Sequence, residues 1–199
     1  MKNEKLYSKR TFDIIISLIL LTLLFPIFII ISGLIIIMSG WPPVVLLTRI
    51  GRGGKKFKII KFRSMIKNAH LHRQEIYKTI PPPTKRRDDP RITKIGHWLR
   101  ETSIDELPQF INVLIGNMSL VGPRPLDQND VKDYPEYFEN LKNFRPGITG
   151  LPQINGRDRA NMQSICALNK TYIKTWSWKL DFKILITTFA VVITKKNAL

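Results

Sequence analysis

One apolar stretch near the N-terminus limits what this chain can fold into. Residues 14–38 contain no charged side chain and are rich in isoleucine and leucine. The stretch exceeds the ~18–20 residues expected of a membrane helix. A cleavable signal peptide fits less well, because its apolar region is about 7–15 residues long and ends at small residues, whereas Trp41, Pro42 and Pro43 follow here. We therefore expect a helix buried in a lipid bilayer.

Pro26 interrupts this stretch near its middle. Its nitrogen cannot donate to the carbonyl of Thr22, and its ring pushes the helix apart there. Each half would be roughly 18 Å long at ~1.5 Å per residue, shorter than the ~30 Å hydrocarbon core. Lipid offers no hydrogen-bond donor for the freed carbonyl of Thr22. The hydroxyls of Ser17, Thr22 and Ser32 are therefore candidates to donate a hydrogen bond to it. Two helical halves with a break at Pro26 are expected.

Basic residues flank the stretch on both sides. Positive charge beside membrane segments prefers the cytoplasm, so both ends favour the same side. We therefore expect a re-entrant helix over residues 1–40, followed by a membrane-apposed catalytic domain over residues 41–199; an ordinary kinked span is the alternative. The flanking residues are Lys2, Lys5, Lys9 and Arg10 before the stretch, and Arg49, Arg52, Lys55, Lys56, Lys58 and Lys61 after it.

The overall charge points to an anionic partner. The chain has 199 residues and a formal net charge of +17. Nucleic acid, anionic lipid and phosphorylated small molecules all fit such a charge. The single cysteine, Cys166, excludes an internal disulfide and is most simply a small core residue.

The remaining pattern predicts an α+β domain that is mostly helical. Residues 44–47 and 57–62 are β-prone and surround a glycine-rich turn, which predicts a small hairpin. Short helices are expected over residues 92–100, 107–114 and 163–178. The apolar tail, residues 180–193, is expected to lie as an amphipathic helix in the membrane interface.

Asp105 and Glu106 are the strongest candidates for chemistry. Either Ser103 and Glu106 form a capping box, or Asp105 itself caps a helix with Pro108 in its first turn. Both arrangements place the carboxylates at a helix N-terminus, where phosphate is also favoured. Two adjacent carboxylates can bind one Mg²⁺ ion together, and one of the two carboxylates can then act as a nucleophile.

Arginines in stiff loops could neutralise a phosphate. Arg124 stands between two prolines, Arg145 precedes Pro146, and Arg157 follows a glycine. Arginine suits bidentate phosphate contacts better than lysine does. An arginine of this kind, taken alone, is more often a structural ion-pair partner, whereas three of them in loops set by proline or glycine are more suggestive of phosphate binding. Lys61 and Arg63 add a basic surface beside the second β-prone run, and they are further candidates for phosphate or lipid-headgroup contact.

Several short motifs occur in one order along nearly the whole chain, and together they resemble the bacterial sugar transferases, the monotopic polyprenyl-phosphate phosphoglycosyl transferases. Any one motif is weak, but the ordered set behind an apolar segment is specific. The motifs are Lys61-Phe62-Arg63-Ser64-Met65, Asp89-Pro90-Arg91-Ile92-Thr93-Lys94-Ile95-Gly96, Leu99-Arg100, Thr102-Ser103-Ile104-Asp105-Glu106-Leu107-Pro108-Gln109, Asn112-Val113-Leu114, Gly116-Asn117-Met118-Ser119, Val121-Gly122-Pro123-Arg124-Pro125, Arg145-Pro146-Gly147-Ile148-Thr149-Gly150 and Gln153-Ile154-Asn155-Gly156-Arg157.

The resemblance implies a reaction. Asp105 would attack the β-phosphate of a UDP-sugar, release UMP and form a covalent aspartyl intermediate, which undecaprenyl phosphate then attacks. Asp105 and Glu106 would bind Mg²⁺, and Arg100 and Arg124 look like phosphate-binding positions. This is the first membrane step of bacterial glycoconjugate or exopolysaccharide assembly, carried out in contact with membrane lipid on the cytoplasmic face of the inner membrane.

The resemblance also implies a helix broken at a proline, which Pro26 matches. The family commonly has serine before this proline, whereas this chain has Phe25, so Thr22 is the candidate to replace that hydroxyl.

The alternative reading is a non-catalytic, membrane-anchored basic protein that binds lipid or nucleic acid. The net charge favours it, but no recognised nucleic-acid motif is present, so we expect no nucleic-acid partner. A purely structural scaffold is a weaker alternative. The sequence does not indicate which sugar is transferred, and it leaves a homodimer open.

Overall fold

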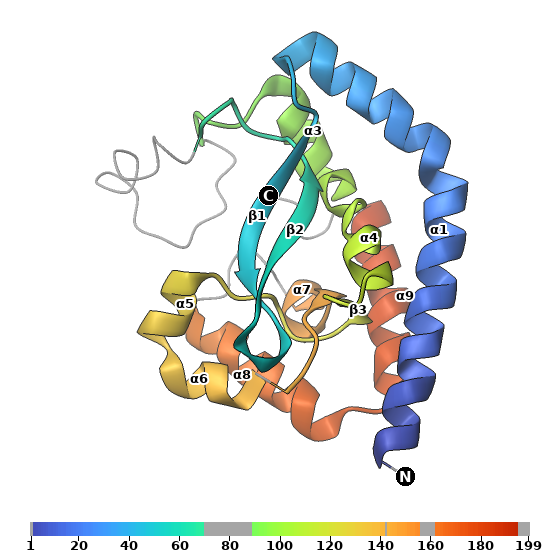
Figure 1. Cartoon of the computed structure of the whole chain (residues 1–199), viewed down its shortest axis with the longest axis vertical. Helices are drawn as coiled ribbons and strands as arrows, with labels where there is room; N and C mark the ends of the chain where they lie inside the picture. The colour runs from blue at the N-terminus through green and yellow to red at the C-terminus, as the bar shows by residue number, and fades with distance from the viewer. Residues whose placement is uncertain (1, 70–88, 142, 156–161, 195–199) are drawn as a thin grey trace.

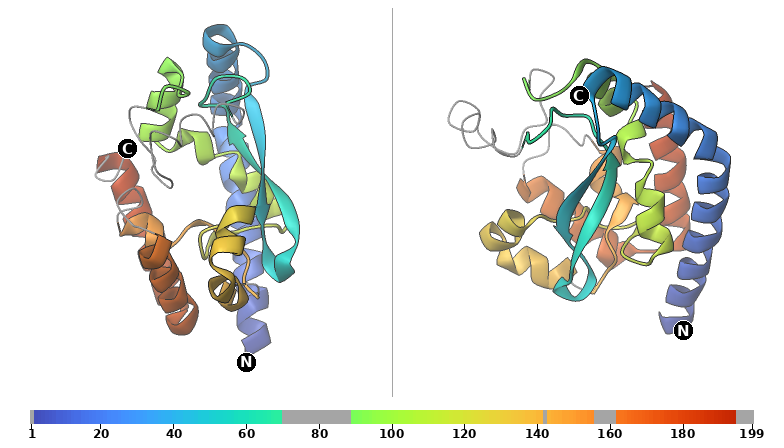
Figure 2. Two further views of the ribbon diagram at one scale, coloured as in Figure 1. Left: turned by 90° about the vertical axis from the view of Figure 1, so that its left-hand side faces the viewer. Right: turned by 45° about the horizontal axis from the view of Figure 1, so that its top comes forward.

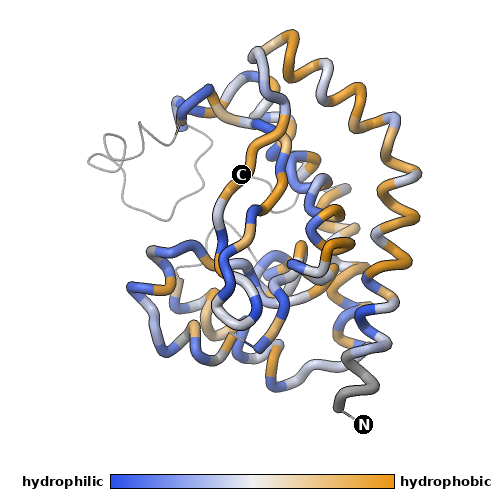
Figure 3. Tube along the Cα trace, viewed as in Figure 1, coloured by the Kyte–Doolittle hydropathy of each residue, from blue (hydrophilic) through white to orange (hydrophobic). Residues whose placement is uncertain are grey.

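The computed structural model describes residues 2–69, 89–141, 143–155 and 162–194. Helix α1 (Lys2–Ser39) runs along one side of the molecule, and the other elements extend away from it to the other side (Figures 1 and 2). Hydrophobic residues follow most of its length (Figure 3). Among the described residues, α1 contains the one segment long and apolar enough to cross a membrane, Tyr7–Ser39.

The predicted apolar helix is present, but it is not split in two. Helix α1 continues through Pro26, and its axis changes direction along its C-terminal half (Figure 1). A proline inside a helix removes one hydrogen bond and kinks the axis, which a single bent helix can accommodate. The Thr22 hydroxyl donates to Leu18 O at 3.0 Å, one turn back, so this bond does not serve the carbonyl that Pro26 frees.

The hairpin is confirmed. Strands β1 (Val44–Ile50) and β2 (Lys56–Phe62) pair antiparallel, with Val44 opposite Phe62 and Ile50 opposite Lys56. The short 3-10 turn η1 (Arg52–Gly54) connects them, and Gly53 there has φ 69, a conformation that glycine adopts without steric cost.

A second small sheet was not predicted. Strands β3 (Ser119–Val121) and β4 (Gly147–Thr149) pair in parallel. A Cβ on Gly147 would lie 2.1 Å from Gly122 N, so the two backbones can approach only because that side chain is absent.

Helices make up most of the remaining described chain. They include the predicted helices, with shifted ends; the helix expected over residues 163–178 stops at Thr175, and a new helix begins at Trp178. The interfacial position expected for the C-terminal helix stays a prediction. The remaining elements are α3 (Lys94–Glu101), η2 (Ile104–Glu106), α4 (Gln109–Leu114), α5 (Gln128–Asp133), α6 (Pro135–Leu141), α7 (Leu151–Ile154), α8 (Met162–Thr175) and α9 (Trp178–Thr194).

Apolar packing holds α1 to the rest of the molecule near both of its ends. Phe12 and Ile16, near its start, pack against a cluster that contains Tyr172. Near its other end, Ile31 and Ile35 are buried in a cluster with side chains of β2 and α3. The described domain therefore lies against both halves of the apolar helix.

Candidate active site

Asp105 and Glu106 lie in the turn η2, between α3 and α4, and each exposes 7% of its surface. Ser103 precedes the turn with φ 56, and Glu106 N donates to Ser103 O at 3.1 Å. The N-cap of α4 is Pro108. Both predicted capping arrangements of α4 are therefore wrong, because a separate 3-10 turn holds the carboxylates and the α-helix begins after it.

Lys61 supplies a positive charge to these carboxylates. Its Nζ lies 2.8 Å from Glu106 Oε1 and 3.9 Å from Asp105 Oδ2. Successive side chains of a strand point to opposite faces. Lys61 therefore meets η2, while its neighbour Phe62 packs against α1. The sequence predicted a phosphate contact for Lys61, and the structure places this ammonium on the carboxylate pair.

Arg100 is the second cation near the pair. Its Nε donates to Ser64 Oγ at 2.9 Å. Burial lowers the pKa of the Arg100 guanidinium, while the negative charges of Asp105, Asp89 and Glu106 act to raise it. Its charge therefore lies within electrostatic reach of all three carboxylates.

Close backbone packing holds Arg100 in place. A Cβ on Gly96 would lie 1.9 Å from Ser64 O, so glycine is required where α3 crosses the end of β2. Thr93 N donates to the same carbonyl at 3.1 Å, and the Thr93 hydroxyl caps α3 by accepting from Gly96 N at 3.0 Å. These contacts fix the start of the helix that carries Arg100.

Asp89 and Arg91 form an ion pair beside this group that the site prediction missed. Arg91 Nε donates to Asp89 Oδ1 at 2.9 Å, and Arg91 Nη2 donates to Asp89 Oδ2 at 2.7 Å. The hydrogen bond from Arg91 holds the pKa of the Asp89 carboxyl below its usual range. Both residues stand in one of the motifs that carried the resemblance, and Ser64 stands in another, so the motifs were the available indication for all three residues.

Arg63 is held away from the carboxylates. Its Nη2 donates to Ser39 O at 2.6 Å and also to Gly40 O. These carbonyls stand at the C-terminal end of α1, where a cation is favoured by the helix dipole. Arg63 exposes 3% of its surface, so this arrangement makes it an anchor for the end of the apolar helix.

Two of the other three predicted arginines have hydrogen bonds elsewhere in the described chain. Arg124 N donates to Asn169 Oδ1 at 3.2 Å, on the side of α8. Arg145 Nε donates to Gly116 O at 2.9 Å, just past the end of α4 opposite from η2. Arg157 lies outside the described residues.

The donor set limits how a metal ion could be held. In the described part of the chain, no group of three His, Cys, Asp or Glu side chains could enclose an ion. Mg²⁺ is often bound by one or two carboxylates together with substrate phosphates. Asp105 and Glu106 already face one cation, the Lys61 ammonium. Their geometry fits an ion shared with a phosphorylated substrate rather than a cage made of protein alone.

Comparison with known proteins agrees with the motifs. The sequence model of the family described as bacterial sugar transferase matches residues 4–195. The chain is 38% identical to the UDP-galactose-lipid carrier transferase of Erwinia amylovora, over 99% of this chain and 43% of that protein. It is 36% identical to the exopolysaccharide production protein ExoY of Sinorhizobium fredii, over 96% of this chain and 88% of that protein.

A third relative is the UDP-glucose:undecaprenyl-phosphate glucose-1-phosphate transferase of Escherichia coli, which is 39% identical over 90% of this chain. The match covers 39% of that protein, so the chain spans less than half the length of some relatives and most of the length of ExoY. The family match extends over the apolar helix, the paired carboxylates and the arginine-bearing loops alike. The chain belongs to the bacterial sugar transferase family.

Proposed function

We propose that this chain transfers a sugar 1-phosphate from a UDP-sugar to undecaprenyl phosphate and releases UMP. The names of the relatives support the two substrate classes. The observation that carries the proposal is the buried carboxylate pair of η2. Lys61 of β2 forms an ion pair with it, and the next residue of the same strand packs against the apolar helix α1. Such a site can meet a charged donor and a lipid acceptor together.

In the proposed reaction, an Asp105 carboxylate oxygen attacks the β-phosphorus of the UDP-sugar. The bond from this phosphorus to the oxygen of UMP breaks, UMP leaves with the electron pair, and the sugar phosphate is joined to Asp105. A phosphate oxygen of undecaprenyl phosphate then attacks the same phosphorus and breaks its bond to Asp105. The products are a polyprenyl diphosphate sugar and the regenerated carboxylate.

Charge balance assigns roles to the neighbouring residues. Two ionised carboxylates repel a diphosphate, and Lys61 offsets part of this charge by holding Glu106. Arg100, fixed through Nε on Ser64, presents a planar guanidinium suited to phosphate oxygens. Mg²⁺ bound by Asp105 and Glu106 would neutralise phosphate charge. The motif that contains Arg124 supports this residue as a further phosphate contact.

The attachment of both ends of α1 supports a monotopic arrangement. Near its start, Asp13 accepts hydrogen bonds from Ser119 Oγ at 2.7 Å and from Leu120 N at 3.1 Å. At its end, Ser39 O accepts from Arg63. A domain that holds both ends of an apolar helix is most simply placed on one side of the bilayer. We propose that the helix enters and leaves by the cytoplasmic face of the bacterial inner membrane.

Release of UMP tests the transfer. The full chain in membranes with Mg²⁺ and undecaprenyl phosphate is screened against a panel of UDP-sugars. At least one donor should give UMP and a polyprenyl diphosphate sugar in equal amounts. Binding of UDP-sugars without release of UMP from any donor would favour the non-catalytic alternative.

Covalent labelling tests the nucleophile. A UDP-sugar carrying ³²P in its β-phosphate should label the wild-type chain and not Asp105→Asn. The matched control is Asp133→Asn, which removes an exposed carboxylate on α5 and should keep the label. Labelling that persists in a folded Asp105→Asn variant would rule out Asp105 as the nucleophile.

A further inference from the structure

The C-terminal end of α4 collects positive charge from distant parts of the chain. Arg10, on α1, donates from Nη1 to Val113 O at 2.6 Å and from Nη2 to Leu114 O at 2.8 Å. Arg145, from the segment before β4, donates from Nε to Gly116 O at 2.9 Å. Two guanidinium groups therefore share one helix end.

A third arginine lies beside them. A Cβ on Gly116 would be 3.4 Å from Arg10 Nη2, which places Arg10 against the residue that binds Arg145. Gly51 and both neighbours of Arg145 line the same small cavity, so the hairpin turn that carries Arg52 meets this segment. We call Arg10, Arg52 and Arg145 the arginine cluster.

The charge of the arginine cluster is only partly balanced within the described chain. Burial lowers the pKa of Arg145, and repulsion from Arg10 and Arg52 lowers it further. A helix C-terminus offers about half a negative charge, against three guanidinium groups. The oxygens of Asp13, the carboxylate that opposes this repulsion, accept hydrogen bonds from β3. No carboxylate of the described residues forms an ion pair with any of the three arginines.

Exposed apolar side chains adjoin the arginine cluster. Ile115, directly before Gly116, exposes 62% of its surface, and Ile14, one turn after Arg10 on α1, exposes 38%. Tyr7 lies one turn before Arg10 and exposes 75%. Guanidinium groups beside exposed apolar residues, at the start of a long apolar helix, match a headgroup layer above hydrocarbon.

We propose that the arginine cluster is a binding site for the phosphate of an anionic phospholipid at the point where α1 enters the bilayer. The inference rests on the membrane attachment proposed above and not on the transfer reaction. A soluble phosphorylated molecule would meet the guanidinium groups but would leave the adjoining Ile115 and Ile14 exposed to water. A lipid covers both kinds of group at once.

Native mass spectrometry of the full chain in detergent tests this site, with phosphatidylglycerol and phosphatidylcholine added separately. Phosphatidylglycerol should bind more tightly to the wild type. Arg52→Gln removes an exposed side chain and should weaken phosphatidylglycerol binding roughly fivefold, the equivalent of about 1 kcal/mol per basic residue at a membrane surface. Arg145→Gln should have a similar effect, and binding of phosphatidylcholine should not change.

The matched control is Lys132→Gln on α5, an exposed residue on the opposite side of the molecule from α1 (Figures 1 and 2). It should leave both affinities unchanged. Equal binding of the two lipids by the wild type, an equal loss in the control, or inorganic phosphate binding as tightly as the lipid would each overturn the proposal. Because UMP is not measured, the result is independent of whether the transfer reaction is correct.

Discussion

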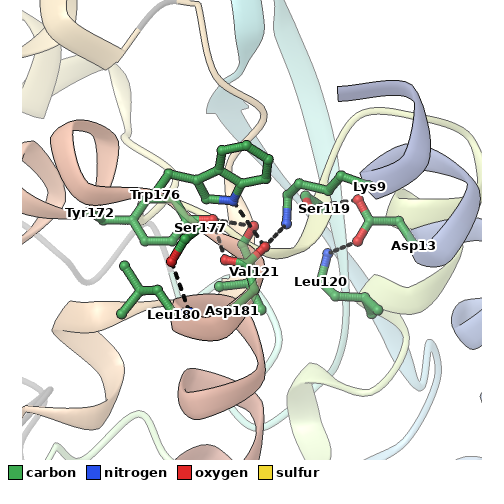
Figure 4. Close-up of polar contacts among 10 residues, drawn as sticks. All are labelled: Lys9, Asp13, Ser119, Leu120, Val121, Tyr172, Trp176, Ser177, Leu180 and Asp181. Carbon is green, nitrogen blue, oxygen red and sulfur yellow. Dashed lines mark hydrogen bonds and ion pairs between the residues drawn. The ribbon is translucent and has the colours of Figure 1, made fainter. Parts of the chain in front are cut away.

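The buried carboxylate of Asp181 provides a quantitative test of how α1 is fastened to the domain. Asp181 exposes 2% of its surface. It accepts hydrogen bonds from Lys9 Nζ at 2.5 Å, Tyr172 OH at 2.8 Å and Trp176 Nε1 at 3.1 Å (Figure 4). Burial and the nearby charge of Asp181 raise the pKa of the Tyr172 phenol, so Tyr172 remains a donor. One carboxylate thus joins α1, α8 and α9.

Asp181→Asn removes the charge and leaves Lys9 facing a neutral amide. Breaking a buried ion pair by changing one partner costs about 3–5 kcal/mol. For a chain of this size, 1 kcal/mol shifts Tm by about 2–4 °C, so Tm should fall by about 6–20 °C. The measurement is intrinsic tryptophan fluorescence during heating in detergent. Trp176 itself donates to this carboxylate, so its emission reports the change directly.

The exposed Asp133→Asn variant serves as the control and should shift Tm by less than about 1 °C. Lys9→Met should also destabilise the chain, and the double variant Lys9→Met with Asp181→Asn should lose less than the sum of the two single changes, because the two residues share one interaction. A decrease of less than about 2 °C for Asp181→Asn, or strict additivity in the double variant, would show that the ion pair does not hold α1 to the domain.

Three further changes probe the site itself. Gly96→Ala should destabilise the chain by at least about 2 kcal/mol, because its Cβ would meet Ser64 O; thermal unfolding measures this, and an unchanged Tm would refute the contact. The pKa of Asp89 is lowered on folding, so its stabilisation is present above the unfolded value of about 3.9 and is lost as pH falls through the folded value. Asp89→Asn should therefore flatten the dependence of Tm on pH below about 4, and an unaltered curve would contradict this. Lys61→Gln should lower the rate of UMP release about 100-fold by removing a charge beside the reacting groups, with Lys132→Gln as the unaffected control.

The sequence predicts those parts of the fold that depend on neighbouring residues. The apolar run predicts α1, and β-prone residues around a glycine-rich turn predict the hairpin. The β3–β4 sheet escaped prediction because its strands are three residues long and pair Ser119 with Gly147 across intervening helices. The continuity of α1 through Pro26 was not predicted, because a proline inside a helical run can either end the helix or kink it, and the local sequence does not decide between the two.

The sequence predicted the residues of the candidate active site only in part, as it did the fold. Asp105, Glu106, Lys61 and Arg100 were identified, and the structure brings them together. The prolines beside Arg145 and Arg124 indicated stiff backbone but not where either side chain would end. Where a guanidinium lies depends on which helix end reaches it in three dimensions.

The end of β2 explains how the apolar helix α1 and a charged site can lie next to each other while their side chains stay on separate faces of one strand. Alternation along a strand sends Lys61 to the carboxylates and Phe62 to the other face, where it packs against Ile31 and Ile35 of α1. Arg63 follows and binds the carbonyls that end α1. Three consecutive residues thus contact the carboxylate pair, the apolar helix and the end of that helix. This strand therefore places the carboxylate pair on one face and the apolar helix on the other, an arrangement that suits the proposed transfer from a water-soluble donor to a lipid acceptor.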